Sequence, residues 1–263
     1  MHYETILFSI EKGIARLMLN RPSKLNSFSE TMHNEIAQVM QFLTQPNNGV
    51  RVLLITGVGR AFCAGQDLSE GQMSGGSIVD LGITVARFYE PLVRNLRALP
   101  IPVIAAVNGV AAGAGANFAL ACDIVVAKSS AFFLQPFVNL GLQPDTGGTY
   151  FLPRLIGSAR AMGLSLLGDK LSADQAEQWG LIWQSIPDEK FEIAVEMLAS
   201  RLASGPSLAH AHIKQALHAS TGNDLDQQLA LERESMRTLG NSDDYREGVG
   251  AFLDKRLPSF NGC

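Results

Sequence analysis

The chain has 263 residues, of which 46% are hydrophobic and 17% are charged, and its formal net charge is −4. This length and apolar content allow one large domain with a substantial core, with or without an appendage. The small negative charge and the lack of a long basic block argue against a protein that binds nucleic acid or anionic membranes.

Cysteine usage indicates a reducing compartment. Cys63, Cys122 and Cys263 lie far apart and without CxxC spacing. An odd count with no signal-peptide pattern near the start argues against a disulfide framework, so we expect a cytoplasmic protein. The apolar stretch 101–127 is interrupted by proline, glycine and asparagine, and we expect a buried strand-turn-helix-strand there, with no membrane span.

Short strands alternating with helices predict an α/β architecture. In chain order we expect strands at 5–10 and 14–19, a helix at 30–44, a strand at 52–56, a helix at 81–99 with a break at Pro91, a strand at 102–107, a helix at 113–122, a strand at 124–127, and helices from 147 and at 172–180. The pattern from 191 to 257 is almost all helical, with its clearest break at Gly205-Pro206. We therefore expect a mixed core at 1–198 and a helical appendage at 199–263.

The first segment that could form a binding or catalytic site is 60–68. It follows an expected strand and reads Arg-Ala-Phe-Cys-Ala-Gly-Gln-Asp-Leu. Gly65 lets the backbone approach a ligand closely and leaves N–H groups free to point at it. An ordinary surface turn is the alternative interpretation, because most loops carry no site.

The second segment, 106–117, leads from a strand through a glycine- and alanine-rich turn into a helix. Free N–H groups and the positive end of the helix dipole coincide at such a start, which suits developing negative charge on an oxygen. Gly113-x-Gly115 is also half of a dinucleotide fingerprint, but Phe118 holds the third glycine position. Close packing of small residues is compatible with the oxyanion interpretation.

The third segment, 140–149, places Asp145 just before an expected helix. Aspartate is a preferred helix N-cap, so a cap is the alternative to a catalytic role. Together and in this order, the three segments resemble the crotonase (enoyl-CoA hydratase/isomerase) superfamily, whose members carry an AFCAG-x-D loop, a VNG-x-A-x-GGG-type helix start and a GGT-containing turn. Asn20-Arg21-Pro22 and Asp244-Tyr245-Arg246-Glu247-Gly248 extend the resemblance along essentially the whole chain.

The resemblance implies a crotonase (ClpP/crotonase-like) fold, in which repeated ββα units make two stacked sheets and C-terminal helices form a trimerisation region. Family members are usually trimers or dimers of trimers. The thioester oxygen of an acyl-CoA substrate would lie between the backbone N–H groups of Gln66 and Ala114. Coenzyme A would contact Lys24, Leu25, Ala64, Gln66, Asp67, Leu68 and, often across a subunit boundary, Lys255. A solvated helix face is an equal alternative for Lys255.

The resemblance implies no separate cofactor, since coenzyme A belongs to the substrate. We expect no metal either, because the five histidines lie outside the three segments and show no HExxH spacing. The related aryl-CoA dehalogenases need a histidine and a tryptophan near the site, and Phe137 stands at the tryptophan's position, so we do not expect dehalogenation.

The acidic positions favour isomerisation over hydration. Hydratases of the family use two glutamates, and Asn117 and Phe137 stand at those positions. Asp145 stands where some isomerases keep a single carboxylate, and one carboxylate can take a proton from one carbon and return it to another. Walls formed by Phe137, Leu142 and Phe151 would raise its pKa.

Within the family, four segments are most similar to the branch that converts ring-1,2-epoxyphenylacetyl-CoA to its oxepin isomer in phenylacetate degradation; these are residues 144–149, 177–183, 231–234 and 244–248. In that mechanism Asp145 removes a proton beside the thioester, and epoxide opening leads to ring expansion. Members of that branch also shift double bonds in 3-enoyl-CoA chains.

Two alternatives stay open at this point. The first is another acyl-CoA specificity, either a fatty Δ3,Δ2-enoyl-CoA isomerase or an enoyl-CoA hydratase, which the pocket wall expected around 71–89 would decide. The second is a catalytically idle crotonase-fold binding protein, including RNA-binding relatives. The net charge of −4 and the absence of a basic helix argue against RNA.

Overall fold

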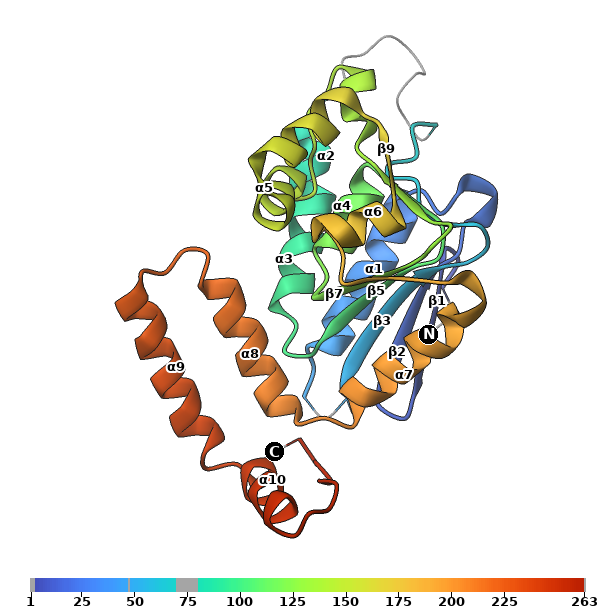
Figure 1. Ribbon diagram of the computed structural model, residues 1–263. Coiled ribbons are helices and arrows are strands. Elements are labelled where there is room, and N and C mark those ends of the chain that lie inside the picture. The colour runs from blue at the N-terminus through green and yellow to red at the C-terminus, as the bar shows by residue number, and fades with distance from the viewer. Residues whose placement is uncertain (1–2, 47, 70–79, 263) are drawn as a thin grey trace.

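The computed structural model describes residues 3–46, 48–69 and 80–262, and these residues form a six-stranded and a four-stranded sheet (Figure 1). The larger sheet has the order β1-β2-β3-β5-β7-β10, in which β1 and β2 are antiparallel and the other neighbours are parallel. Its strands are β1 (Ile6–Glu11), β2 (Ile14–Leu19), β3 (Val52–Gly57), β5 (Val103–Val107), β7 (Ile124–Lys128) and β10 (Gln184–Ile186).

The smaller sheet has the order β4-β6-β8-β9 and consists of β4 (Ala61–Cys63), β6 (Val110–Ala112), β8 (Phe132–Leu134) and β9 (Lys170–Ser172). Strands β3, β5 and β7 of the larger sheet are each followed directly by a strand of the smaller one, and a helix comes next. This repeated ββα order confirms the fold class predicted from the sequence. The three-residue strands of the smaller sheet were not predicted, and β4 occupies part of the segment expected to be a loop.

The core lies between these sheets and the helices that cover them (Figure 1). Helices of this region are α1 (Glu30–Leu43), α2 (Leu81–Thr84), α3 (Glu90–Ala98), α4 (Ala114–Leu120), α5 (Gly148–Leu167) and α6 (Ala173–Trp179). Helix α1 buries the face that the apolar spacing predicted, including Met32, Ile36 and Val39. The Ser29 side chain accepts a hydrogen bond from the Met32 N–H at 3.1 Å, which caps the helix start.

The opposite face of the larger sheet is covered by α7 (Phe191–Ala203). Phe191, Val195 and Ala199 of this helix pack against residues of β2, β3, β5 and β7, among them Ile104. The domain boundary expected between 198 and 199 falls inside α7, because this helix stays on the sheet as far as Ala203.

The remaining helices, α8 (Ser207–Ala219), α9 (Leu225–Leu239) and α10 (Asp243–Leu253), extend away from the sheets (Figure 1). The break predicted at Gly205-Pro206 separates α7 from α8. Arg51 fixes this break, because its guanidinium donates to Ser207 Oγ at 3.0 Å and to the Phe260 carbonyl at 3.2 Å. No helix within the described ranges is long and apolar enough to cross a membrane.

The helix expected at 81–99 is interrupted. A π-helical turn, η2 (Val85–Tyr89), lies between α2 and α3, and Pro91, which has no N–H to donate, follows it directly. The irregularity expected at Pro91 is therefore present, as a π-helical turn just before the proline inside a continuous helical segment. The π turn carries Tyr89, whose ring is buried.

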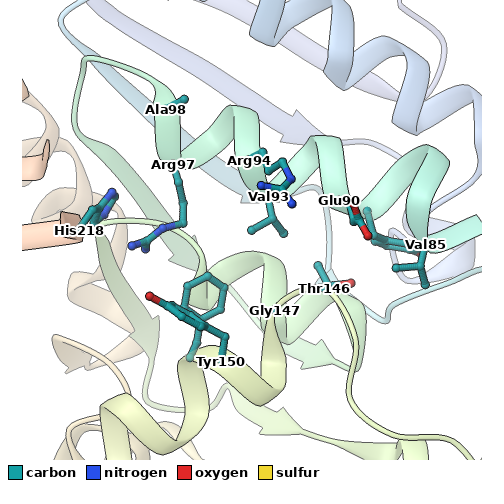
Figure 2. Close-up of a pocket in the computed structure, with 12 residues that line it drawn as sticks. Val85, Glu90, Val93, Arg94, Arg97, Ala98, Thr146, Gly147, Tyr150 and His218 are labelled. Carbon is teal, nitrogen blue, oxygen red and sulfur yellow. The ribbon is translucent and has the colours of Figure 1, made fainter. Parts of the chain in front are cut away.

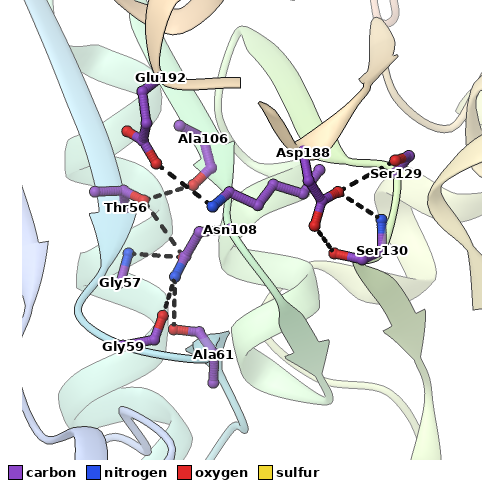
Figure 3. Close-up of polar contacts among 11 residues, drawn as sticks. Thr56, Gly57, Gly59, Ala61, Ala106, Asn108, Ser129, Ser130, Asp188 and Glu192 are labelled. Atoms are coloured by element: carbon purple, nitrogen blue, oxygen red, sulfur yellow. Dashed lines mark hydrogen bonds and ion pairs between the residues drawn. The ribbon is translucent and has the colours of Figure 1, made fainter. Parts of the chain in front are cut away.

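Asn108 joins two loops that lead towards the site (Figure 3). Its Nδ2 donates to the Gly59 carbonyl at 2.9 Å, and its Oδ1 accepts from the Gly57 N–H at 3.1 Å. We call these two bonds the Asn108 clamp. A Cβ on Gly109 would lie 2.2 Å from the Arg60 carbonyl oxygen, so only glycine fits next to Asn108. Asp188 closes a second loop in the same view, where its carboxylate accepts from the Ser130 N–H at 3.1 Å.

His33 is buried between aromatic rings. It stacks on Phe28 at 4.8 Å and on Phe88 at 5.0 Å between centroids, and Tyr89 meets it edge-on at 4.6 Å. Neither ring nitrogen has a hydrogen-bond partner in the described part of the chain. Burial lowers the pKa of His33 from 6.5 to about 4, so the ring is neutral in the folded protein at neutral pH.

His33 should therefore make the protein acid-labile. Between pH 6.5 and about 4 the unfolded chain binds a proton at His33 that the folded chain does not, so the free energy of unfolding falls as the pH is lowered through this window. The loss attributable to His33 should reach about 3 kcal/mol. Urea unfolding of wild type and His33→Phe at several pH values measures it. The variant should show a shallower dependence, and equal dependence in both proteins would contradict the assignment.

Candidate active site

A cavity of about 530 Å³ lies where the three sequence segments meet. It is lined by Ala64, Gly65, Gln66, Leu68, Leu81, Thr84, Val85, Tyr89, Gly113, Ala114, Pro136, Phe137, Leu140, Leu142 and Asp145. The structure thus brings together the three residues predicted to carry the chemistry, Gln66, Ala114 and Asp145. Most of the other lining residues are apolar.

The peptide before Gln66 is held by a neighbouring strand-like segment. The Phe28 N–H donates to the Gly65 carbonyl at 2.7 Å, and the Asp67 N–H donates to the Phe28 carbonyl at 2.9 Å. In a trans peptide the N–H points opposite to the preceding C=O. The Gln66 N–H therefore points away from Phe28, and no described residue accepts a hydrogen bond from it.

Ala114 is the first residue of α4, where a backbone N–H has no partner within the helix. A Cβ built on Gly65 would lie 3.4 Å from the Ala114 nitrogen, so the two loops are in close contact. Gly115 makes this contact possible, since a Cβ there would lie 2.3 Å from the Cys63 carbonyl oxygen. Two free N–H groups thus lie on one wall of the cavity, as an oxyanion hole requires.

Asp145 lines the same cavity and lies in the turn before α5. The N-cap residue of α5 is Gly147, which has no side chain to cap the helix, so the capping role considered for Asp145 does not apply. The Asp145 carbonyl accepts from the Asn117 Nδ2 and from the Gly148 N–H, both at 2.8 Å. These bonds fix the backbone that carries the carboxylate.

Burial raises the pKa of Asp145 above its ordinary value, and a hydrogen bond from Thr146 Oγ1 to Oδ1 at 2.9 Å opposes this shift. The sequence also predicted a raised pKa for Asp145. Phe137 and Leu142 line the same cavity as Asp145, whereas Phe151 lines the adjoining one. A carboxylate with a raised pKa is a stronger base.

The positions that hold glutamates in hydratases have other tasks here. Asn117 is fully buried, donates to the Asp145 carbonyl and accepts from Gln135 Nε2 at 2.8 Å. Phe137 covers the helix start, where a Cβ on Gly113 would lie 3.6 Å from its ring. Among the described residues that line this cavity, Asp145 is the one acid.

Apart from Lys255, the residues predicted to contact coenzyme A lie on two adjoining loops, at 24–25 and 64–68. The Ala64 N–H donates to the Leu25 carbonyl at 3.0 Å, and Lys24 Nζ donates to Ser69 Oγ at 3.2 Å. Ala64 and Leu68 line the cavity itself. Lys255 follows α10, which lies at the other end of the molecule from α2 and α4 (Figure 1), and it does not line the cavity, so its predicted role requires a neighbouring subunit.

Asp67 lies on the second of these loops, and its side chain holds that loop in place by bonds to Arg21 and Ser69. Hydrogen bonds from Ser69 and the nearby Arg21 guanidinium, 2.9 Å away, lower its pKa to about 2 in spite of burial. The carboxylate is therefore ionised and paired. The expected contact of Asp67 with coenzyme A concerns its backbone alone.

A second cavity of about 660 Å³ adjoins the first between α3 and α5 (Figure 2). Val85 and Tyr89 line both cavities, so they separate one from the other. The pocket wall expected around 71–89 is described only from residue 80, and residues 71–79 of that expectation lie outside the described residues. Arg97 and His218 also line the second cavity, and sequence reasoning missed both.

The described residues place no three His, Cys, Asp or Glu side chains together in a way that could hold a metal ion. The cavity itself combines two backbone donors, one carboxylate, three other polar side chains and otherwise apolar walls.

Comparison with known proteins identifies the family. Residues 9–263 match the model of the enoyl-CoA hydratase/isomerase family. The chain belongs to this family, the crotonase superfamily. It is 53% identical over 260 residues to the 1,2-epoxyphenylacetyl-CoA isomerase of Escherichia coli, covering 98% of this chain and 99% of that protein.

Two other crotonases show the range of the family. The 2,3-dehydroadipyl-CoA hydratase of Escherichia coli is 37% identical over 98% of both chains. The crystal structure of the enoyl-CoA hydratase from Bacillus anthracis superimposes with a TM-score of 0.91 at 32% identity, covering 99% of this chain and 100% of that one. The same fold therefore carries both hydratase and isomerase names among its relatives.

The contact beneath the helix start can be tested with Gly115→Ala. The added methyl group meets the Cys63 carbonyl, so we expect a loss of about 1–3 kcal/mol in unfolding free energy. The displaced Ala114 N–H should lower kcat by about tenfold or more. Gly163→Ala in α5 is the matched control, because a Cβ there meets nothing within 4 Å. Its stability should rise by up to about 1 kcal/mol. Equal effects of both substitutions would contradict the contact.

Proposed function

We propose that this crotonase is an acyl-CoA isomerase in which Asp145 moves a proton between two carbons of the acyl group. The observation that supports this most strongly is the composition of the cavity, where Asp145 is the one acid among the described lining residues. Hydration needs one group to activate water and another to protonate carbon, whereas a proton shift needs a single base that returns its proton.

The thioester carbonyl fits the wall formed by Gln66 and Ala114. Removal of a proton from the carbon beside the thioester moves negative charge onto the carbonyl oxygen, and two backbone N–H groups stabilise that oxyanion by about 3 kcal/mol each. The protonated Asp145 then returns the proton to the carbon two positions further along the chain. No atom is gained or lost, and the double bond moves into conjugation with the thioester.

We propose 1,2-epoxyphenylacetyl-CoA as the substrate and its oxepin isomer as the product, as in phenylacetate degradation. The 53% identity to the isomerase of that name in Escherichia coli supports this choice. An arene oxide interconverts with its seven-membered oxepin form. In that form a ring double bond joins the second and third carbons from the thioester carbonyl. The same proton shift by Asp145 then gives the conjugated product, so a 3-enoyl-CoA should react in the same way.

The central test is turnover of a 3-enoyl-CoA, a 2-enoyl-CoA and the ring epoxide by wild type and Asp145→Asn. Wild type should isomerise the first and third and barely hydrate the second, and the variant should lose isomerisation by about a hundredfold or more. Asp226→Asn, on the exposed side of α9, is the control. Robust hydration that survives in Asp145→Asn would contradict the proposal, and binding of acyl-CoA without any turnover would indicate an idle scaffold.

The pH profile gives an independent check. The ionised form of Asp145 is the base, so kcat/KM should fall as the pH is lowered through the pKa of this carboxyl. Because burial raises that pKa, the acid limb should lie above the pH range of an ordinary aspartate. An acid limb at or below that range would contradict the assignment of Asp145.

We also propose that the protein is a cytoplasmic trimer or dimer of trimers. The helices α8–α10 and the segment after them expose large apolar side chains, among them Phe252, which is 83% exposed, and Leu257, which is 90% exposed. A neighbouring subunit that covers this surface would also carry Lys255 towards an adjacent coenzyme site. Sedimentation velocity should give three or six times the chain mass, and a monomer at micromolar concentration would contradict the assembly.

A further inference from the structure

Tyr89 and the side chain of Gln66 form a polar pair on the cavity wall. The Tyr89 hydroxyl donates to Gln66 Oε1. Apart from this pair, Asp145 and Thr84 are the polar side chains among the described residues that line the cavity. The proton shift needs the carboxylate and the backbone donors, so it leaves this pair without a task.

The tyrosine is held rigidly. Its side chain is 2% exposed, and its ring packs edge-on against His33 at 4.6 Å and against Phe28 at 5.8 Å. Burial, together with the nearby charge of Asp145, raises the pKa of Tyr89, so its hydroxyl stays protonated and remains a donor. The π turn that carries it is a local departure from α-helical geometry, which occurs frequently at functional sites.

The bond to Tyr89 also orients the Gln66 amide. An amide group has one accepting oxygen and one donating nitrogen, and rotation by half a turn exchanges them. Because Oε1 accepts from Tyr89, the Nε2 group is left to donate elsewhere, and no described residue accepts from it. The same residue supplies the backbone N–H proposed to bind the thioester oxygen. Its amide therefore lies within one side-chain length of the acyl carbons that follow the thioester.

We propose that Tyr89, acting through the Gln66 amide, makes this cavity selective for acyl-CoA thioesters that carry a hydrogen-bond-accepting oxygen on the second or third carbon from the thioester carbonyl. The proposal rests on the proposed function, since it assumes that an acyl-CoA occupies the cavity. An epoxide or oxepin oxygen has this position, whereas a hydrocarbon 3-enoyl chain has no such atom. Tyr89 is a positioning residue, and Gln66 Nε2 makes the contact with substrate.

The expected effect is one of selectivity. A hydrogen bond between neutral groups changes affinity by about tenfold or less. Wild type should bind 2-hydroxyphenylacetyl-CoA about fivefold to tenfold more tightly than phenylacetyl-CoA, because the added oxygen meets the oriented amide. Tyr89→Phe keeps the buried ring but frees the amide to rotate, so the two ligands should then bind within about twofold of each other.

Titration calorimetry with both ligands on wild type, Tyr89→Phe, Gln66→Leu and the double variant tests the proposal. Each single variant should lose the preference, and the double variant should lose no more than either, since both changes remove one contact. Tyr245→Phe, on α10, is the tyrosine control and should keep the preference. Binding of phenylacetyl-CoA by Tyr89→Phe at wild-type affinity shows that the variant is folded.

Two results would overturn the inference. One is equal binding of both ligands by wild type, and the other is an equal loss of both ligands in Tyr89→Phe, as expected for a purely structural tyrosine. Failure of the proposed function is distinguishable from these. A wild-type preference that depends on Tyr89, combined with no isomerase turnover on any acyl-CoA, would support this inference while contradicting the role of Asp145.

Discussion

The site depends on the contact between the start of α4 and strand β4. Gly115 rests against the Cys63 carbonyl with no room for a Cβ, and Gly65 packs in turn beside the Ala114 nitrogen. These glycines bring two chain segments, nearly fifty residues apart in sequence, close enough for their free N–H groups to share one oxygen. The Asn108 clamp and the Phe28 bridge fix the same loop from its other sides. Backbone donors held in this way need no reorganisation when charge develops on a bound oxygen.

The second constraint is the backbone of Asp145. Its carbonyl oxygen accepts two hydrogen bonds, one of them from Asn117, while its carboxylate faces a mostly apolar cavity. The family resemblance of the sequence assigns a hydratase glutamate to position 117, and here Asn117 at that position holds the turn that carries Asp145. Under the proposed function, an amide at this position replaces one acid and supports another. Such an exchange would let one fold serve hydration in some relatives and isomerisation in others.

Much of this arrangement could be predicted from the sequence. The three segments, their order and the apolar spacing of α1 were sufficient for the fold class, and the glycines indicated where backbone N–H groups would be free. The three-residue strands β4, β6 and β8 could not be predicted, because such short segments carry no measurable periodicity. Their existence depends on pairing between distant parts of the chain, which local patterns do not contain.

The cavity walls show the same limit. Tyr89 lies in a stretch expected to be helical with a break at Pro91. The local pattern did not show that its hydroxyl donates to Gln66 or that its ring packs against Phe28 and His33. His218 lines the second cavity from α8, outside every segment that carried the family resemblance. In both cases the residue type did not predict a position at a cavity, because that position depends on contacts between distant parts of the chain.

The most direct test of the single-carboxylate account is the fate of deuterium in a 3-enoyl-CoA labelled at the carbon beside the thioester. If Asp145 alone removes and returns the proton, and its burial slows exchange with water, a measurable fraction of the label should appear two carbons further along in the 2-enoyl-CoA product. Mass spectrometry of the product, with wild type in ordinary water, measures that fraction. Complete replacement of the label by solvent hydrogen at early turnover would contradict a single shielded base and would require a second proton carrier in the site.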